Sequence, residues 1–61
     1  MDVKLSRVAR GFKVSSETVR NWANRKGLPC RCIEDERIFN SAEVEAWAKK
    51  NGKQLDPRWL E

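Results

Sequence analysis

Apolar side chains recur at helical spacing in three segments of this 61-residue chain, and a short strand-like stretch lies between the second and the third. In the first segment, apolar residues at positions i, i+3, i+4 and i+7 form one stripe, which predicts an amphipathic helix. The stripe consists of Leu5, Val8, Ala9 and Phe12. Because Gly11 weakens helix propensity near its end, we expect this helix to run from Val3 to Phe12.

The second segment predicts a helix over residues 15–26. Ser15 is a suitable N-cap, because its hydroxyl can accept a hydrogen bond from a free amide of the first turn. Gly27 supplies a left-handed C-cap, and Pro29 prevents the helix from continuing. The inward stripe of this helix is Val19, Trp22 and Ala23.

The connection between these two helices is very short. Only Lys13 and Val14 separate Phe12 from Ser15. Two short helices joined by so few residues must cross at a steep angle, which is the geometry of a helix-turn-helix motif.

A hairpin is predicted over Cys30–Phe39. Its two strand-like runs, residues 30–33 and 37–39, flank a charged loop of three residues, Glu34, Asp35 and Glu36. The loop contains neither glycine nor asparagine, the residues that tight hairpin turns favour.

The third helix is expected over Asn40–Asn51. Asn40 or Ser41 caps it, Asn40 and Glu43 have capping-box spacing, and Gly52 ends it. Beyond Gly52, Trp59 lies in an irregular segment, where it either folds back onto the core or marks the start of a further region.

The order helix, tight turn, helix, hairpin, helix predicts a mainly α fold with a small β-hairpin, a winged helix-turn-helix. We expect this domain over residues 1–52 and a C-terminal tail over residues 53–61. A single small core is predicted from Leu5, Val8, Ala9, Phe12, Val14, Val19, Trp22, Ile38, Phe39, Val44 and Trp47.

The positive charge of the chain is concentrated in its first half. The net charge is +4. Residues 1–29 carry seven basic and two acidic side chains, residues 30–39 two basic and three acidic, and residues 40–61 four of each. A localised basic surface favours a nucleic-acid partner over a merely soluble basic surface.

The outward face of the second predicted helix carries side chains suited to base edges. Glu17, Asn21 and Asn24 lie opposite the inward stripe, flanked by Arg20 and Arg25. Arginine can bind guanine O6 and N7, asparagine can bind adenine N6 and N7, and glutamate can accept from cytosine N4. A solvated polar face is the alternative for these residues taken alone.

Hydroxyl groups at the start of this helix suit a phosphate, helped by free amides and the helix dipole. In the hairpin, Arg31 and Arg37 can contact a phosphate or the minor groove, although the acidic loop between them repels a phosphate backbone. The alternative is a hairpin that only completes the core. The predicted DNA-binding residues are Ser15, Ser16, Glu17, Thr18, Arg20, Asn21, Asn24, Arg25, Lys26, Arg31 and Arg37.

The sequence offers no chemistry for catalysis or for metal binding. Cys30 and Cys32 are its only cysteines, and it has no histidine, so a tetrahedral zinc site lacks ligands. We expect one buried cysteine and one half-exposed thiol in a reducing cytoplasm. No nucleophile lies beside a base and no glycine-rich phosphate loop is present. We therefore expect no enzyme, no cofactor and no small-molecule substrate, and neither a signal peptide nor a membrane span.

Several ordered motifs resemble the excisionase and MerR-like winged-helix families. Residues 8–22 carry the pattern Val-Ala-x-x-Phe-x-Val-Ser-x-x-Thr-Val-x-x-Trp, residues 27–29 read Gly-Leu-Pro, and residues 37–40 and 42–47 continue the match. The resemblance covers residues 4–48, and the N-terminal domain of phage terminase small subunits is also similar.

The resemblance implies that the second helix enters the major groove and that the hairpin lies near the adjacent minor groove. It places DNA contacts at Ser16, Thr18, Arg20, Asn21 and Arg25 in the helix and at Arg31 and Arg37 in the wing. Two features depart from the family pattern. Lys13 stands where the motif usually has glycine, so it adopts a positive φ at some cost or the turn differs, and the wing tip is acidic.

The leading hypothesis is sequence-specific binding of double-stranded DNA, as an excisionase or recombination directionality factor. A terminase packaging module and a MerR-like transcription regulator are alternatives, with further copies of the chain or a recombinase or packaging protein as partners. A protein-docking winged helix that uses the acidic tip and Trp59 is the alternative of another class. Phosphate contacts make affinity depend steeply on salt, whereas apolar docking does not.

Overall fold

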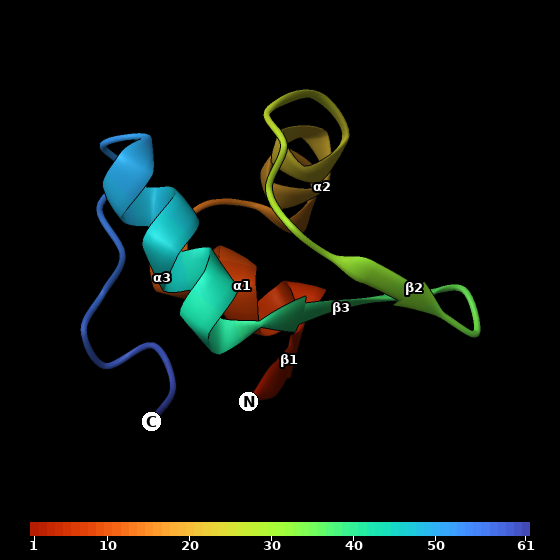
Figure 1. The fold of residues 1–61 in the computed structure, drawn as a ribbon. Coiled ribbons are helices and arrows are strands. Elements are labelled where there is room, and N and C mark those ends of the chain that lie inside the picture. The colour runs from red at the N-terminus through yellow and green to blue at the C-terminus, as the bar shows by residue number, and fades with distance from the viewer.

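The computed structural model describes residues 1–61 and contains three helices and a three-stranded antiparallel sheet (Figure 1). The winged helix-turn-helix prediction is confirmed. The elements in chain order are β1 (Asp2–Lys4), α1 (Leu5–Phe12), α2 (Ser16–Arg25), β2 (Arg31–Ile33), β3 (Glu36–Asn40) and α3 (Ser41–Lys50).

The sheet has a strand that the sequence analysis missed. We expected the first helix to begin at Val3, but residues 2–4 form β1, and the strand order is β1-β3-β2 rather than a two-stranded wing. Val3 pairs with Phe39, and both side chains are buried. Asp2 and Lys4 are exposed on either side of Val3, so the segment has the period of two that a half-buried strand requires. Helix α1 starts only at Leu5.

Side-chain caps define where α2 and α3 begin, as predicted. The Ser15 hydroxyl accepts from the Thr18 amide at 3.2 Å. The Asn40 side chain accepts from the amides of Ala42 and Glu43 at 3.0 and 3.2 Å. These bonds satisfy amides that have no partner within the helix.

Helix α2 ends at the predicted glycine. Gly27 has a φ of 74°, and the Leu28 amide donates to the Trp22 carbonyl at 3.3 Å. This bond closes the chain over the left-handed Gly27 and satisfies a carbonyl of the last turn of α2. It turns the chain toward the sheet and brings Leu28 into the core.

The turn between α1 and α2 has the strained residue that the sequence analysis allowed for. Lys13 is left-handed, with φ 59° and ψ 43°, and its amide donates to α1 carbonyls. The Val14 amide donates to the Ala9 carbonyl at 3.0 Å. A lysine in this conformation costs about 1 kcal/mol or more relative to glycine, so the packing of α1 against α2 must hold it in place.

The hairpin turn is shorter than expected. We predicted a loop of three residues, but Glu36 belongs to β3 and pairs with Ile33. Only Glu34 and Asp35 connect the strands, with φ values of 50° and 66°. Two successive positive φ values define a type I′ turn, which suits the twist of the strands.

Of the eleven residues predicted to form the core, seven are buried and four are only partly buried. Ile38 is only half-buried, because β3 alternates and places Phe39 on the inner face. Leu5, Val14 and Trp22 pack against the core while partly exposed. The buried apolar side chains that were absent from the predicted core are Val3, Leu28, Ala48 and Trp59.

Three aromatic rings join the three helices. Phe12 makes edge-to-face contacts with Trp22 at 5.1 Å and with Trp47 at 6.1 Å between ring centroids. Trp22 and Trp47 lie 5.5 Å apart, and the Trp47 indole donates to the Lys26 carbonyl at 3.1 Å. The Lys53 ammonium lies 5.0 Å from the Trp22 ring centroid and partly covers it. These contacts fix the position of α2 on the other two helices.

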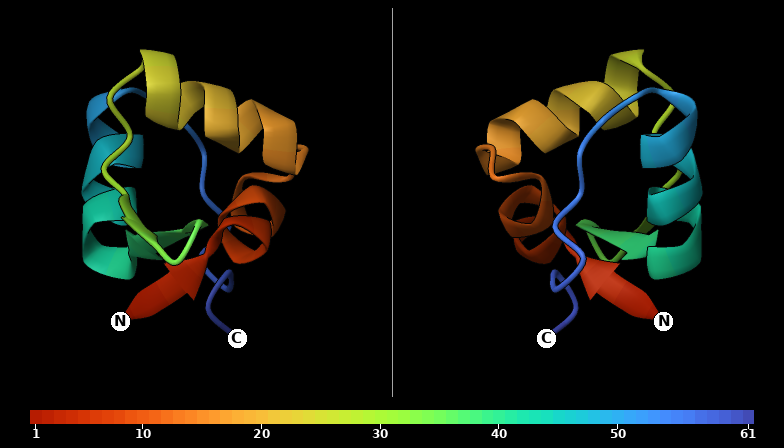
Figure 2. Two further views of the ribbon diagram at one scale, coloured as in Figure 1. Left: turned by 90° about the vertical axis from the view of Figure 1, so that its right-hand side faces the viewer. Right: turned by 90° about the vertical axis from the view of Figure 1, so that its left-hand side faces the viewer.

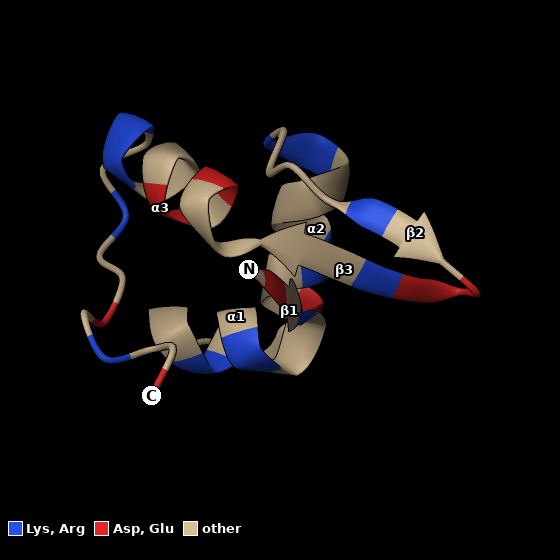
Figure 3. Ribbon diagram, turned by 60° about the horizontal axis from the view of Figure 1, so that its bottom comes forward, with Lys and Arg blue, Asp and Glu red and all other residues tan.

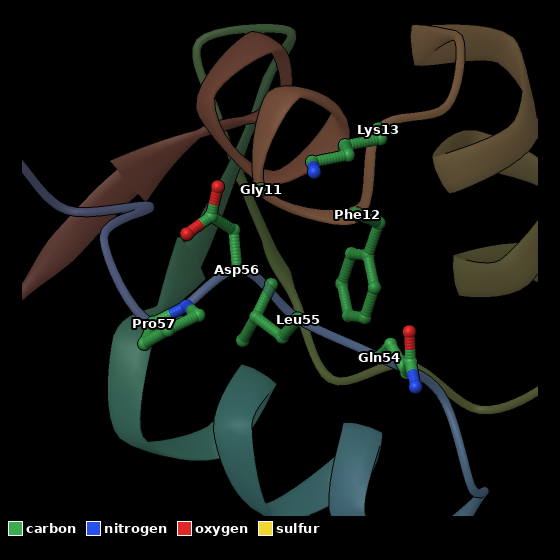
Figure 4. Close-up of a pocket in the computed structure, with 7 residues that line it drawn as sticks. All are labelled: Gly11, Phe12, Lys13, Gln54, Leu55, Asp56 and Pro57. Atoms are coloured by element: carbon green, nitrogen blue, oxygen red, sulfur yellow. The ribbon is translucent and has the colours of Figure 1, made fainter.

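Residues 53–61 run between α1 and α3, as the right-hand view of Figure 2 shows. The Asp56 amide donates to the Gly11 carbonyl at 2.9 Å, and the indole of the buried Trp59 donates to Glu45 at 3.2 Å. Figure 4 shows Leu55 and Asp56 against the end of α1. Of the two interpretations of Trp59, the structure therefore supports folding back onto the core.

Candidate nucleic-acid interface

Helix α2 presents two exposed rows of polar side chains on the side away from the core. Val19 is fully buried, whereas Trp22 and Ala23 are half-buried. With about 3.6 residues per turn, residues four apart line up along the opposite face. The row next to the hairpin, the wing-side row, is Ser16, Arg20 and Asn24; the outer row is Glu17, Asn21 and Arg25. All six residues are exposed.

A groove of about 560 Å³ lies between the wing and two residues of the wing-side row, Ser16 and Arg20. It lies where the start of α2, the start of α1 and the hairpin meet. Three cationic side chains, Lys4, Arg20 and Arg37, line it together with the acidic Asp35 and Glu36. Its other lining residues are Leu5, Ser6 and Ser16.

Lys4 and Ser6 lie in this groove, although the sequence analysis did not select them. The alternation of Asp2, Val3 and Lys4 would have indicated a strand, and only the pairing of β1 with β3 brings Lys4 close to the wing. The Lys4 ammonium lies 3.4 Å from the Glu36 carboxylate. Both side chains are more than half exposed, so this ion pair stabilises the fold little.

The two wing arginines, which we predicted in the same role, have different surroundings. Arg37 is half-buried and donates to the Asn24 side-chain oxygen at 2.8 Å and to the Cys30 sulfur at 3.6 Å. Arg31 is exposed on the other face of the sheet, where it pairs with Asp2 at 3.4 Å. Arg37 therefore links the wing to α2, whereas Arg31 can rearrange toward a phosphate at little cost.

The predicted phosphate site at the start of α2 is partly occupied by the protein itself. The hydroxyls of Ser15 and Thr18 are hydrogen-bonded to each other at 2.9 Å, and Ser15 also caps the helix. Ser16 is exposed and has no such bond. At the other end of α2, Arg25 and Lys26 are both exposed.

Charge is distributed unevenly over the surface. Figure 3 shows basic residues along the outer side of α1, at the end of α2 and on β2, and acidic residues at the hairpin tip. The tip carries Glu34, Asp35 and Glu36, all exposed. A DNA backbone is therefore attracted to the helix-turn-helix and repelled by the end of the wing.

The two cysteines are free thiols. We expected one buried and one half-exposed thiol, but Cys30 is half-buried and Cys32 is exposed. The Arg37 guanidinium donates to the Cys30 sulfur and covers part of it. The structure brings no three histidine, cysteine, aspartate or glutamate side chains together as a metal-binding group. None of the helices has both the length and the apolar character to span a membrane.

Helices α1 and α2 are joined by a three-residue turn, and the exposed polar face of α2 lies beside the wing. This arrangement defines a winged helix-turn-helix domain of the DNA-binding class. A model of the family described as "Helix-turn-helix domain" matches residues 4–52, and the chain belongs to this family. This membership supports DNA binding by a helix-turn-helix. No curated protein matches the chain.

Proposed function

We propose that the protein binds double-stranded DNA in a sequence-specific manner, with α2 in the major groove and the wing beside it. The observation that carries the proposal is the exposed face of α2, whose two rows include arginine, asparagine and glutamate side chains. The wing-side row borders a groove lined by three basic and two acidic side chains. These residue types match the donor and acceptor pattern of base edges in the major groove. The protein acts by binding, and we propose no catalytic step.

Within this site, Arg20 and Asn21 contact bases and Arg31 contacts the phosphate backbone. Arg20 faces the groove next to the wing, and Asn21 lies on the outer row, so both sides of α2 are available to the DNA. Arg31 is exposed and held only by an exposed ion pair with Asp2.

A titration of duplex DNA at several salt concentrations tests this proposal. Each phosphate contact contributes a slope of about −0.9 to the dependence of log affinity on log salt. We expect a steep negative slope, which Arg31→Ala lowers by about one unit while weakening all duplexes equally. No binding at low salt, or a slope near zero, would contradict DNA binding.

We propose that the biological role is that of an excisionase or recombination directionality factor. The helix-turn-helix family of this chain is found in excisionase-like proteins. Such a role needs several copies side by side on DNA or contact with a recombinase. Footprinting on selected DNA separates the alternatives. An array of direct repeats supports this role, whereas another arrangement of sites favours a terminase packaging module or a MerR-like regulator.

A protein-docking function is the second candidate, and the acidic wing tip favours it. Glu34, Asp35 and Glu36 are exposed and repel phosphates, so they suit a basic protein surface better than DNA. Binding that is insensitive to Arg20→Ala but is lost when Glu34 and Asp35 are neutralised would support docking over DNA binding.

A further inference from the structure

We infer that Arg37 is a specificity-determining residue, which orients the Asn24 amide so that α2 offers only hydrogen-bond donors to the base facing it. The base that fits such a surface is guanine. The inference rests on the proposed DNA binding. It assigns Arg37 a role other than the phosphate contact that the sequence led us to expect.

Strand register directs Arg37 toward α2. Arg37 lies two residues before the buried Phe39 on β3, and residues two apart in a strand share a face. Its partner across the hairpin is Cys32, whereas Arg31 is paired with Ile38 on the opposite face. The inner face of the wing therefore holds Arg37 against the helix, and the 2.8 Å bond to Asn24 follows from this placement.

The chemistry of arginine determines which end of the Asn24 amide faces the wing. A guanidinium has five N–H donors and no acceptor, so only the Asn24 oxygen can meet it. The Asn24 amino group, with two donors, then lies away from the wing and makes no hydrogen bond within the protein. A bond between a charged donor and an amide oxygen is also stronger than a neutral one, which stabilises this orientation.

This orientation excludes the usual contact between asparagine and adenine. That contact needs the asparagine oxygen to accept from adenine N6 while the amino group donates to N7. In this protein the oxygen is occupied by Arg37, and its second lone pair lies beside a positive charge that repels the amino group of adenine or cytosine. Guanine presents two acceptors, N7 and O6, in the major groove. Both are compatible with donors from Asn24 and from the free N–H groups of Arg37.

The test is selection from random duplexes with the wild-type protein and with Arg37→Ala. The base facing Asn24 is identified as the one whose preference disappears in Asn24→Ala. We expect guanine there for the wild-type protein. In Arg37→Ala the freed amide can turn, and the ratio of guanine to adenine should fall about tenfold or more. Arg31→Ala is the matched control, and it should lower affinity for all duplexes with the preference unchanged.

A second variant keeps the wing contact and replaces the two donors of the Asn24 amino group by a carboxylate oxygen, which only accepts. Asn24→Asp preserves a bond to Arg37 but has no N–H, so the preference for guanine should be lost while the helical circular dichroism spectrum stays native. A guanine preference that survives in Arg37→Ala, with affinity lowered on all duplexes alike, would overturn the inference and return Arg37 to a phosphate role. Failure of the wild-type protein to bind any duplex would instead overturn the proposed function itself.

Discussion

In the helix-turn-helix body, α1, α2 and α3 meet around Phe12, Trp22 and Trp47, whereas residues 31–38 of the wing contain no fully buried side chain. The body is basic on its outer side, and the wing ends in three acidic residues. Two short regions of one small domain are thus stabilised by different means, the body by aromatic packing and the wing by backbone pairing and its contact with α2.

This difference assigns the two regions different parts in DNA binding. The packed body holds α2 rigidly, which base contacts require because they depend on position. The wing is attached to the body through β1, through Phe39 and through the contact of Arg37 with Asn24. Substitutions in the body should therefore affect folding first, and substitutions in the wing should affect recognition first.

The largest expected effect is that of Trp22→Ala. Removal of a fully buried aromatic side chain costs about 3–5 kcal/mol, and for the half-buried Trp22 we expect a cost of about 3 kcal/mol. A domain of this size has a total free energy of unfolding of about 3–9 kcal/mol. The loss of the contacts with Phe12 and Trp47 should leave the variant unfolded or barely folded at room temperature.

Urea denaturation followed by circular dichroism measures this effect. Ile33→Ala in the wing is the control, because Ile33 is 50% exposed and a surface substitution shifts stability by about 0.5 kcal/mol or less. Near-native stability of Trp22→Ala would remove the claimed difference between body and wing.

Gly11→Ala examines whether residues 53–61 belong to the packed body. A Cβ atom at Gly11 would lie 2.7 Å from the Trp59 Cβ and 2.9 Å from the Leu55 Cδ1. Such overpacking costs about 1–3 kcal/mol, although alanine in a free helix would gain about 1 kcal/mol over glycine. We expect a lower melting temperature.

A double-mutant cycle with Trp59→Gly separates these two effects. Removal of the Trp59 side chain should abolish most of the cost of Gly11→Ala, because the nearest clashing atom is gone. An unchanged cost in the Trp59→Gly background would show that the tail does not pack against α1.

The double variant Glu34→Asn with Asp35→Gly tests how much the turn of the wing contributes to stability. Both residues have positive φ values, and Asn-Gly is the preferred sequence of a type I′ turn. Relief of the left-handed strain should raise the free energy of unfolding by about 1 kcal/mol. The same denaturation curve reports it, and a destabilised double variant would argue against the type I′ turn.

Removal of metal ions should not change the melting temperature. The wing begins with Cys30 and Cys32, and no third ligand lies with them. A melting curve recorded with a strong chelator should superimpose on the curve without it. A lowered melting temperature would mean that the wing is held by a metal rather than by strand pairing.

The features that sequence reasoning predicted well depend on neighbouring residues. Ser15 and Asn40 cap helices through amides two or three residues away, and Gly27 ends α2 through its own φ value. Local chemistry of this kind is visible in the sequence, and it was enough to define the helix-turn-helix and the third helix.

The features that were missed depend on residues far apart in the chain. Strand β1 forms because Val3 meets Phe39, 36 positions away. The bond between Arg37 and Asn24 spans 13 positions. It gives Arg37 surroundings different from those of Arg31, although the two arginines look equivalent in the sequence. Trp59 packs against α1 at Gly11, where any larger residue would place a Cβ atom in its way. No local sequence pattern reveals this contact. For the site, sequence reasoning selected the face of α2 but did not find Lys4 or the partner of Asn24.

The most direct measurement of the central claim is methylation protection on a duplex selected by the protein. Guanine N7 lies in the major groove, so a helix inserted there shields it from dimethyl sulfate. The account predicts protected guanines with the wild-type protein and loss of protection at one of them with Arg20→Ala. Specific binding with every guanine N7 still reactive would contradict it, because α2 would then not occupy the major groove.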